Sequence, residues 1–420
     1  MPGGRDGEAE RAMDMSITIV TCAGGATWEA PLVRGLQRPE LGVRVLRRCV
    51  DHGELLGVAL RDRPHAVVLA AELPWLDRDL VGTLQDAGVI VVAVESRAGV
   101  RPVDAVGVSY RVGPATSAEE LAGLLHRIGA VDDDRRVRFD EPGDAPTVHT
   151  GGNAGRIVVV WGAPGAPGRT TVATHVATEY ARSGRATVLV DGDAWSASIA
   201  QLLGLDEAPA VSNAVRLAGD GWPHPLESCL HDGPHGVRVL PGLARADLWP
   251  EVRERSWQAV LDAIRDRADV VVIDVAAPID EDEELSFDRA PYRRNVMTRV
   301  ALRDADAVLT VVGGDPIGLR RGIFAWRDLA RELPAVAERA LLVVNRAPAS
   351  PRRLQECSVE LERWTGERPA ALLPVEAAFE HAVWEGRTLH DVARRSPWLR
   401  DLRALLAVPL LRVESERSIA

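Results

Sequence analysis

The chain has 420 residues, of which 46% are hydrophobic, and it carries a formal net charge of −11. This length exceeds that of one ordinary domain, and the hydrophobic content is enough for separate cores, so we expect two domains. The acidic balance makes nucleic acid an unlikely main partner, because binding to a phosphate backbone calls for a basic face. The sequence has no apolar run of 18 residues and no signal-peptide pattern, which favours a cytoplasmic protein with at most peripheral membrane contact.

Five short apolar segments alternate with helical patterns between residues 16 and 130. Residues 1–15 lack any periodicity, and we expect a disordered tail there. The expected strands are 17–22, 43–49, 66–71, 89–94 and 105–110, and the expected helices are 28–37, 53–63, 78–87 and 117–128. This alternation predicts an α/β domain with a doubly wound, flavodoxin-like (βα)5 fold.

In outline this first domain resembles a response-regulator receiver. That family has an acidic pair after its first strand, a phosphate-accepting aspartate at the end of the third and a lysine after the fifth. Here the first strand ends Thr21-Cys22-Ala23, Ala70 stands at the acceptor position, and the chain contains no lysine. The resemblance therefore implies a pseudo-receiver that contacts a protein partner and takes up no phosphate. Glu72 is the nearest acid and could replace the acceptor, whereas the alternative is an ordinary loop acid.

Residues 131–155 combine runs of charge with proline and glycine and show no apolar period, which is typical of an interdomain linker. We place the second domain at residues 156–413 and a short tail at 414–420.

The segment 156–171, RIVVVWGAPGAPGRTT, has the order of a buried strand, a glycine-rich loop and a helix. Its glycines, Gly162, Gly165 and Gly168, leave room for backbone N–H groups to converge on an anion at a helix N-terminus. The end of the phosphate-loop motif G-x-x-x-x-G-K-[ST] is matched from Gly168, but Ala163 replaces the first glycine. We predict a nucleotide site here, and the alternative is a plain turn between a strand and a helix.

Arg169 stands where the motif has its lysine, and all 50 basic residues of the chain are arginines. Arginine keeps the charge and can bind phosphate through two N–H groups, but its planar head cannot fill the site of a compact ammonium group. The substitution therefore favours nucleotide binding over hydrolysis.

Further apolar strands are expected at 187–193, 269–275, 307–314, 340–346 and 371–375. The first of them ends in two acids, Asp191 and Asp193, and the second contains Asp274 near its end. Ligands of open α/β sheets collect at the carboxyl ends of strands. We therefore expect a doubly wound, mainly parallel sheet with helices on both faces.

In their order these motifs resemble the MinD/ParA group of P-loop ATPases over essentially the whole second domain. The resemblance implies a site for ATP and Mg²⁺ in which Thr170 and Asp274 lie at the metal. It implies that Asp193, which helps to place the attacking water, and Arg169 are the catalytic candidates, and that Asn345 and Pro374 surround the adenine. The phosphate loop would consist of Gly165, Ala166, Pro167, Gly168, Arg169, Thr170 and Thr171.

With a degenerate receiver in front, the layout is similar to the CpaE/TadZ family, which is associated with polar localisation and Tad/Flp pilus assembly, and to actinobacterial septum-site proteins. The resemblance implies an ATP-dependent homodimer, a protein partner in a secretion, pilus or division apparatus, and recruitment to a pole, a septum or the membrane face. Pro164 stands where the group has a lysine that reaches the phosphates of the partner subunit. Because proline has no donor, we expect slow hydrolysis or none, dependent on an arginine from outside the loop. Arg293 and Arg294 are the nearest candidates in sequence, and the alternative is that they pair with the acidic run 280–284.

Two rival functions remain open at this point: a scaffold that binds no nucleotide, and a ParA-like ATPase that partitions DNA. The acidic run 280–284 could be a metal site, but a solvated loop is the ordinary explanation of five adjacent acids. The leucine-rich segment 398–413 is interrupted by Pro409, and we expect it to pack against the domain rather than to lie in a membrane.

Overall fold

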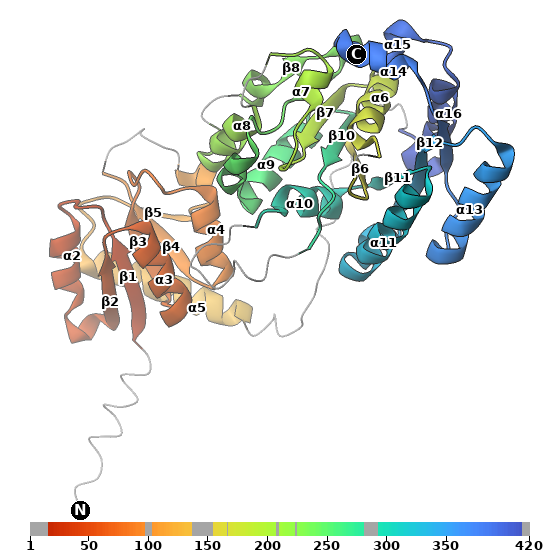
Figure 1. Cartoon of the computed structure of the whole chain (residues 1–420). Helices are drawn as coiled ribbons and strands as arrows, with labels where there is room; N and C mark the ends of the chain where they lie inside the picture. The colour runs from red at the N-terminus through yellow and green to blue at the C-terminus, as the bar shows by residue number, and fades with distance from the viewer. Residues whose placement is uncertain are drawn as a thin grey trace, which may run out of the picture. The chain divides into compact units, whose positions relative to one another are not determined.

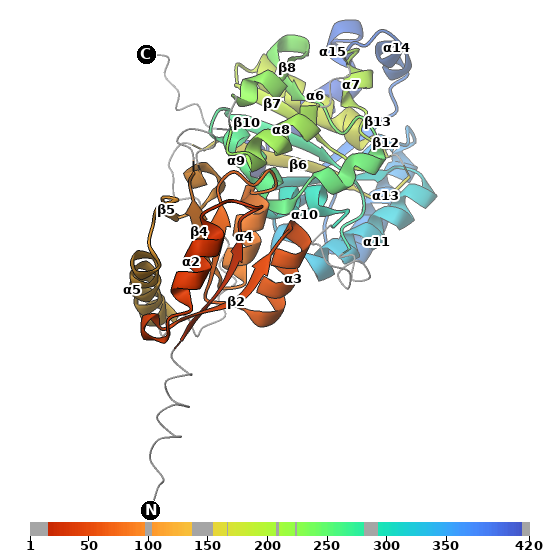
Figure 2. The same cartoon turned by 90° about the vertical axis from the view of Figure 1, so that its left-hand side faces the viewer.

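The computed structural model describes residues 16–96, 103–136, 154–165, 167–206, 210–222, 225–280 and 293–413. The chain divides into two compact units, Met1–Val148 with Gly219–Pro223, and His149–Ala218 with His224–Ala420. The expected tails at 1–15 and 414–420, most of the expected linker, and residues 281–284 of the acidic run lie outside the described residues. Figure 1 and Figure 2 show that each unit is built on a sheet of its own.

The first unit contains a five-stranded parallel sheet with the order β2-β1-β3-β4-β5, the order of flavodoxin-like folds. The carboxylates of Asp51 and Asp77 cap α3 and α4 by accepting N–H groups of Glu54 and Leu80. The strands are β1 (Ile17–Cys22), β2 (Val43–Cys49), β3 (Ala66–Ala70), β4 (Ile90–Val94) and β5 (Tyr110–Val112). The helices are α2 (Glu29–Leu36), α3 (His52–Asp62), α4 (Arg78–Asp86) and α5 (Ala118–Arg136), with 3₁₀ turns at Pro39–Leu41 and Val103–Val106.

Two sequence-based boundaries in this unit are wrong. The fifth strand was expected at 105–110, but the chain forms a 3₁₀ turn at Val103–Val106 and only then a three-residue edge strand, β5. Val103, Val106 and Val108 are nevertheless almost fully buried. Their apolar character therefore reflects burial in a turn rather than in a strand. Helix α5 continues to Arg136, six residues into the segment expected to be linker.

The second unit contains an eight-stranded sheet with the order β13-β12-β11-β6-β10-β7-β9-β8. All neighbouring strands are parallel except β8 and β9. The strands are β6 (Arg156–Gly162), β7 (Thr187–Gly192), β8 (His231–Asp232), β9 (Arg238–Leu240), β10 (Val270–Val275), β11 (Ala307–Gly313), β12 (Ala340–Ala347) and β13 (Ala371–Pro374). The expectation missed only the short strands β8 and β9.

Helices connect these strands and flank the sheet (Figure 1). The longer ones are α6 (Arg169–Arg182), α8 (Ala210–Gly219), α9 (Glu254–Arg265), α10 (Val296–Asp304), α11 (Pro316–Glu332), α13 (Pro351–Thr365), α14 (Ala378–Trp384) and α16 (Pro397–Leu406). Single turns form α7 (Ile199–Leu202), α12 (Pro334–Ala337) and α15 (Leu389–Val392), and 3₁₀ turns lie at Leu226–Cys229, Pro234–Gly236, Ala246–Glu251 and Pro409–Leu411.

Alternate residues of one strand face two different helical layers, as expected for a doubly wound sheet. Val311 and Val343 pack into a core with α6 and α16, whereas the next residues, Val312 and Val344, pack into a second core with Trp326 of α11. Both faces of the sheet are therefore covered, which confirms the mainly parallel α/β fold expected for this part of the chain.

The C-terminal segment packs against the second unit, as expected. Trp398, Leu399 and Leu402 of α16 are fully buried in the core that also contains α6. The Tyr180 hydroxyl donates to the carbonyl of Leu411 over 2.6 Å. No helix in the described part of the chain has the length and apolar character needed to cross a bilayer.

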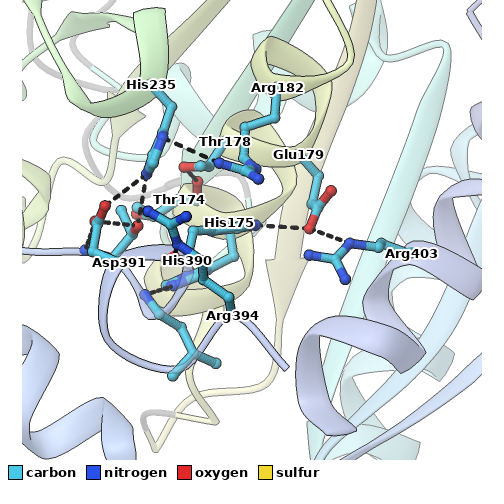
Figure 3. Close-up of polar contacts among 12 residues, drawn as sticks. Thr174, His175, Thr178, Glu179, Arg182, His235, His390, Asp391, Arg394 and Arg403 are labelled. Carbon is cyan, nitrogen blue, oxygen red and sulfur yellow. Dashed lines mark hydrogen bonds and ion pairs between the residues drawn. The ribbon is translucent and has the colours of Figure 1, made fainter. Parts of the chain in front are cut away.

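A buried polar cluster joins α6 to the C-terminal segment (Figure 3). His175 donates through Nδ1 to the carbonyl of Thr171 over 2.7 Å and accepts the N–H of Leu389 at Nε2 over 2.9 Å. Glu179 accepts from His390 and from Arg403, each over 2.7 Å. One face of the helix that follows the glycine-rich loop is therefore bound to both α15 and α16.

Candidate nucleotide site

The glycine-rich loop leads from the end of β6 into the N-terminus of α6. Gly165 and Gly168 have φ angles of +101° and +95°, a left-handed backbone that glycine adopts without strain. Gly168 is the N-cap of α6 and offers no capping side chain, so the first N–H groups of the helix face the loop. This is the arrangement in which helix N-termini bind phosphate groups. Pro164 and Gly165 are exposed, and Ala166 lies outside the described residues.

Arg169 turns back onto the loop rather than away from it. Its Nη1 donates to the carbonyls of Ala163 over 3.0 Å and Gly162 over 3.3 Å. Its Nη2 lies 3.5 Å from Oδ2 of Asp193, and both side chains are largely buried. The structure thus brings the two catalytic candidates together as an ion pair, with the loop carbonyls as further partners of the guanidinium group.

Thr170 and Asp274 meet at the base of the loop. Thr170 lies close enough to Asp274 to lower the pKa of that carboxyl group, and the Oδ1 atom of Asp274 is buried without a hydrogen-bond partner among the described residues. Burial, together with the neighbouring charge of Asp191, raises the pKa of Asp274 well above its usual range. Asp191 and Asp274 are direct neighbours across β7 and β10. A buried carboxylate oxygen without a donor fits a cation, and so the two predicted metal ligands fit Mg²⁺.

The described residues contain no cluster of three or more histidine, cysteine or acidic side chains placed to hold a metal by themselves. This agrees with the chemistry of Mg²⁺, which commonly takes one or two protein ligands together with waters and the phosphates of a substrate.

The loop after β7 is organised by its two acids. Asp191 is 1% exposed and accepts the N–H groups of Ser198 and Ile199 over 2.8 and 2.9 Å, while burial raises its pKa to about 6. Asp193 accepts the N–H groups of Trp195 and Ser196, each over 2.9 Å. Asp191 thus has a structural role, whereas the Asp193 carboxylate, also buried, lies beside Arg169.

Arg294 stacks on Trp195, which follows Asp193 in this loop. Its guanidinium carbon lies 3.4 Å from the centroid of the indole ring, the geometry of a cation–π contact. The Trp195 indole N–H also donates to the Asn295 side chain over 3.3 Å. One of the two arginines singled out in the sequence therefore lies beside the loop of Asp193. Pairing of Arg293 and Arg294 with residues 281–284 falls outside the described residues.

Asn345 lies near the carboxyl end of β12 and is buried. Its Nδ2 donates to the carbonyl of Pro167 over 2.8 Å, and its Oδ1 accepts the indole N–H of Trp398 over 3.0 Å. The amide thus ties the glycine-rich loop to α16, a role that the sequence did not indicate because Trp398 is 53 residues away. Adenine recognition by Asn345 and Pro374 stays a prediction, and Pro374 ends β13, half-buried.

The corresponding end of the sheet in the first unit contains a cavity of about 510 Å³. It is lined by Ala70 at the end of β3 and by loop residues that follow β1, β3 and β4, among them Gly24, Glu72 and Ser96. Glu72 accepts the backbone N–H of Ser96 over 2.7 Å. Ala70, at the expected acceptor position, contributes no carboxylate, and the relationship to receivers stays a prediction.

No family model matches the chain. Among curated proteins it is 26% identical over 148 residues to an uncharacterised ATP-binding protein of Methanocaldococcus jannaschii, covering 35% of this chain and 49% of that protein. It is 25% identical over 247 residues to the antiactivator FleN of Pseudomonas aeruginosa, covering 57% of this chain and 81% of FleN. The septum site-determining protein MinD of a Synechocystis strain is 28% identical over 177 residues, or 39% of this chain and 61% of MinD. The first of these matches thus spans about half of the relative's length.

Solved structures of similar fold include a ParA family ATPase from Chlorobium tepidum, with 20% identity, a TM-score of 0.49, and coverage of 61% of this chain and 100% of that one. MinD of Pyrococcus horikoshii, complexed with Mg-ADP, has 18% identity, a TM-score of 0.47, and coverage of 60% and 93%. Because both TM-scores lie below 0.5, these likenesses say nothing about what this chain binds. The sequence similarities, in contrast, relate the chain to the MinD/ParA-type P-loop ATP-binding proteins.

Proposed function

We propose that the second unit binds ATP together with Mg²⁺ at the loop between β6 and α6. The observation that carries this proposal is the meeting of Thr170 with Asp274, whose buried Oδ1 atom lacks a partner among the described residues. A buried acid without a donor costs stability unless a ligand compensates it. Bound Mg²⁺ would supply that compensation and neutralise phosphate charge.

The phosphates would lie against the glycine-rich loop and the N-terminus of α6, where Gly165 and Gly168 leave the backbone accessible. The adenine would lie near Asn345 and Pro374. Because the Asn345 amide already bonds to Pro167 and Trp398, reading the base would require that it exchange one of these bonds.

In this proposal the domain works as a switch and hydrolyses ATP slowly or not at all. Pro164 offers no donor to a partner's phosphates, and Arg169 is engaged by two loop carbonyls and by Asp193. Asp193 would place the attacking water only after its pair with Arg169 opens. A positioned arginine can raise the rate of phosphoryl transfer by roughly 10³ to 10⁵. We assign this role to Arg294, which stacks on Trp195 in the loop of Asp193.

At the cellular level we propose a localisation or assembly factor of the CpaE/TadZ type. ATP would drive a homodimer of the second unit, and the pseudo-receiver would bind a protein of a pilus, secretion or division apparatus. The supporting observations are the strand order of the first unit and the Ala70 that replaces an acceptor aspartate. Direct DNA partitioning is disfavoured by the net charge of −11.

The rival proposal is a scaffold that binds no nucleotide, and the engagement of Arg169 with the loop carbonyls favours it. Titration of the full chain with a fluorescent ATP analogue, with and without Mg²⁺, separates the two. We expect saturable binding that Mg²⁺ strengthens and that unlabelled ATP reverses better than GTP. A chain that gives no saturable signal in either buffer would be a scaffold.

A further inference from the structure

A second arginine reaches the glycine-rich loop from a distant part of the sequence. Helix α11 starts directly after β11, and β11 is the neighbour of β6, with Val311 opposite Gly162. The glycines of α11 let the helix approach the sheet closely: a Cβ atom on Gly318 would lie 2.7 Å from the Cα atom of Gly313, and one on Gly322 would lie 3.1 Å from Cβ of Val312. This close packing brings the first turns of α11 beside the loop.

The side chain of Arg321 fills the space in front of Gly165. A Cβ atom on Gly165 would collide with Nη1 of Arg321 and would lie 3.2 Å from its Cζ. Gly165 directly follows Pro164, the position at which the resemblance to the MinD/ParA group implies a lysine. A guanidinium group therefore lies at the part of the loop where the chain lacks a cation of its own.

Arg321 differs from its neighbours on α11 in having no competing partner. It is exposed, and no hydrogen bond or ion pair to it occurs within the described part of the chain. Arg320 and Arg327, in contrast, lie 5.6 and 5.2 Å from the ring centroids of Phe324 and Trp364. Arg169, within the loop, is bound to carbonyls and to Asp193. Arg321 is thus the loop-facing cation that is free to meet an anion.

We propose that Arg321 binds the phosphates of the nucleotide from within the same chain and replaces the cation that is missing at Pro164. The inference rests on the proposed function and deepens it by naming a phosphate-binding residue. A guanidinium group binds phosphate oxygens through parallel N–H···O bonds, and such charge-assisted bonds are about twice as strong as neutral ones. Because it is supplied in cis, this contact needs no partner subunit.

The test compares Arg321→Ala, Arg321→Lys and the control Arg327→Ala, an exposed arginine on the same helix, in the ATP titration described above. We expect Arg321→Ala to weaken ATP binding about tenfold or more, because a hydrogen bond to a charged group is lost. Arg321→Lys should keep part of the affinity, and Arg327→Ala should match the wild type. Thermal unfolding of the three variants should agree with that of the wild type, since the side chains are exposed.

Wild-type affinity in Arg321→Ala would overturn this inference and leave the proposed function intact. Equal weakening in Arg327→Ala would overturn it as well, because the effect would then reflect the net charge of the helix. A wild-type chain that binds no ATP would refute both, and that outcome is distinguished by the wild-type titration alone.

Discussion

At the scale of single residues, the site is marked by an acid that the folded chain leaves uncompensated. Asp274 lies next to Thr170, and its Oδ1 atom is buried without a partner among the described residues. Asp191 in the neighbouring strand is satisfied by three backbone N–H groups, although burial raises its pKa too. This contrast between the two neighbours supports our proposal that Asp274, and not Asp191, is the acid beside a bound cation.

Asp274→Asn should therefore stabilise the chain when Mg²⁺ is absent. The substitution replaces a buried group whose ionised form is disfavoured by a neutral amide of the same shape. We therefore expect the free energy of unfolding to rise by about 1–3 kcal/mol. The gain should grow with pH, because a raised pKa means that stability is lost as rising pH forces the acid to ionise. Chemical denaturation of the wild type and the variant in EDTA at several pH values measures this difference in unfolding free energy.

Asp306→Asn is the matched control, since Asp306 pairs with Arg265 over 3.0 Å and accepts the N–H of Ile157 over 2.7 Å. That variant should lose stability by about 1–3 kcal/mol, because it breaks satisfied bonds. If Asp274→Asn lost as much unfolding free energy as Asp306→Asn, Asp274 would not be an uncompensated acid.

At the scale of elements, buried histidines connect α6, the helix that follows the loop, to α15. His175 lies one turn after Thr171 and bridges the Thr171 carbonyl to the N–H of Leu389 in α15. Because it donates at one nitrogen and accepts at the other, the imidazole is neutral, and burial lowers its pKa to about 3. Protonation would remove the acceptor for Leu389 and so loosen α6 from α15.

The stability that His175 confers should be present above about pH 6.5 and lost as the pH falls toward 3, because the unfolded chain takes up the proton first. His175→Gln should reduce the slope of unfolding free energy against pH between 4 and 6 by up to about 1.4 kcal/mol per pH unit. Asp191, with its pKa raised to about 6, acts with the opposite sign, so the difference between variant and wild type is the informative quantity.

Urea denaturation at fixed pH values provides these slopes. The exposed His381 on α14 offers the matched control His381→Gln, since removing that imidazole changes no buried contact. A slope in His175→Gln equal to that of the wild type would show that His175 does not hold α6 in this way.

Elements with long apolar runs could be predicted from the sequence, and short or edge elements could not. The central strands β6 and β10 followed from runs such as VVVI, which only a doubly covered sheet buries. The two- and three-residue strands β8 and β9 have no such run. In the site, Thr170 could be placed from the phosphate-loop motif and Asp274 from the end of its strand. The bond of Asn345 to Trp398 and the approach of Arg321 to Gly165 could not, because they join segments far apart in sequence.

At the scale of the whole molecule, the first unit should not accept phosphate. Ala70 ends β3 where an acceptor would stand, and the chain has no lysine to stabilise an acyl phosphate. Incubation of the full chain with acetyl phosphate and Mg²⁺, followed by intact-mass measurement, should show no added mass. A stoichiometric gain that Glu72→Gln removes would instead identify Glu72 as the acceptor.

The central claim is that Mg-ATP binds at the loop between β6 and α6, and calorimetric titration of wild type against Gly168→Val tests it most directly. A Cβ atom on Gly168 would face the Asn345 amide and the space that we assign to phosphate. Gly366→Val is the matched control, because Gly366 has a similar φ of +81° but open space around it and lies at the end of α13. We expect Mg-ATP to bind the wild type and Gly366→Val alike and to show no heat with Gly168→Val; equal binding by all three would contradict the assignment of the site.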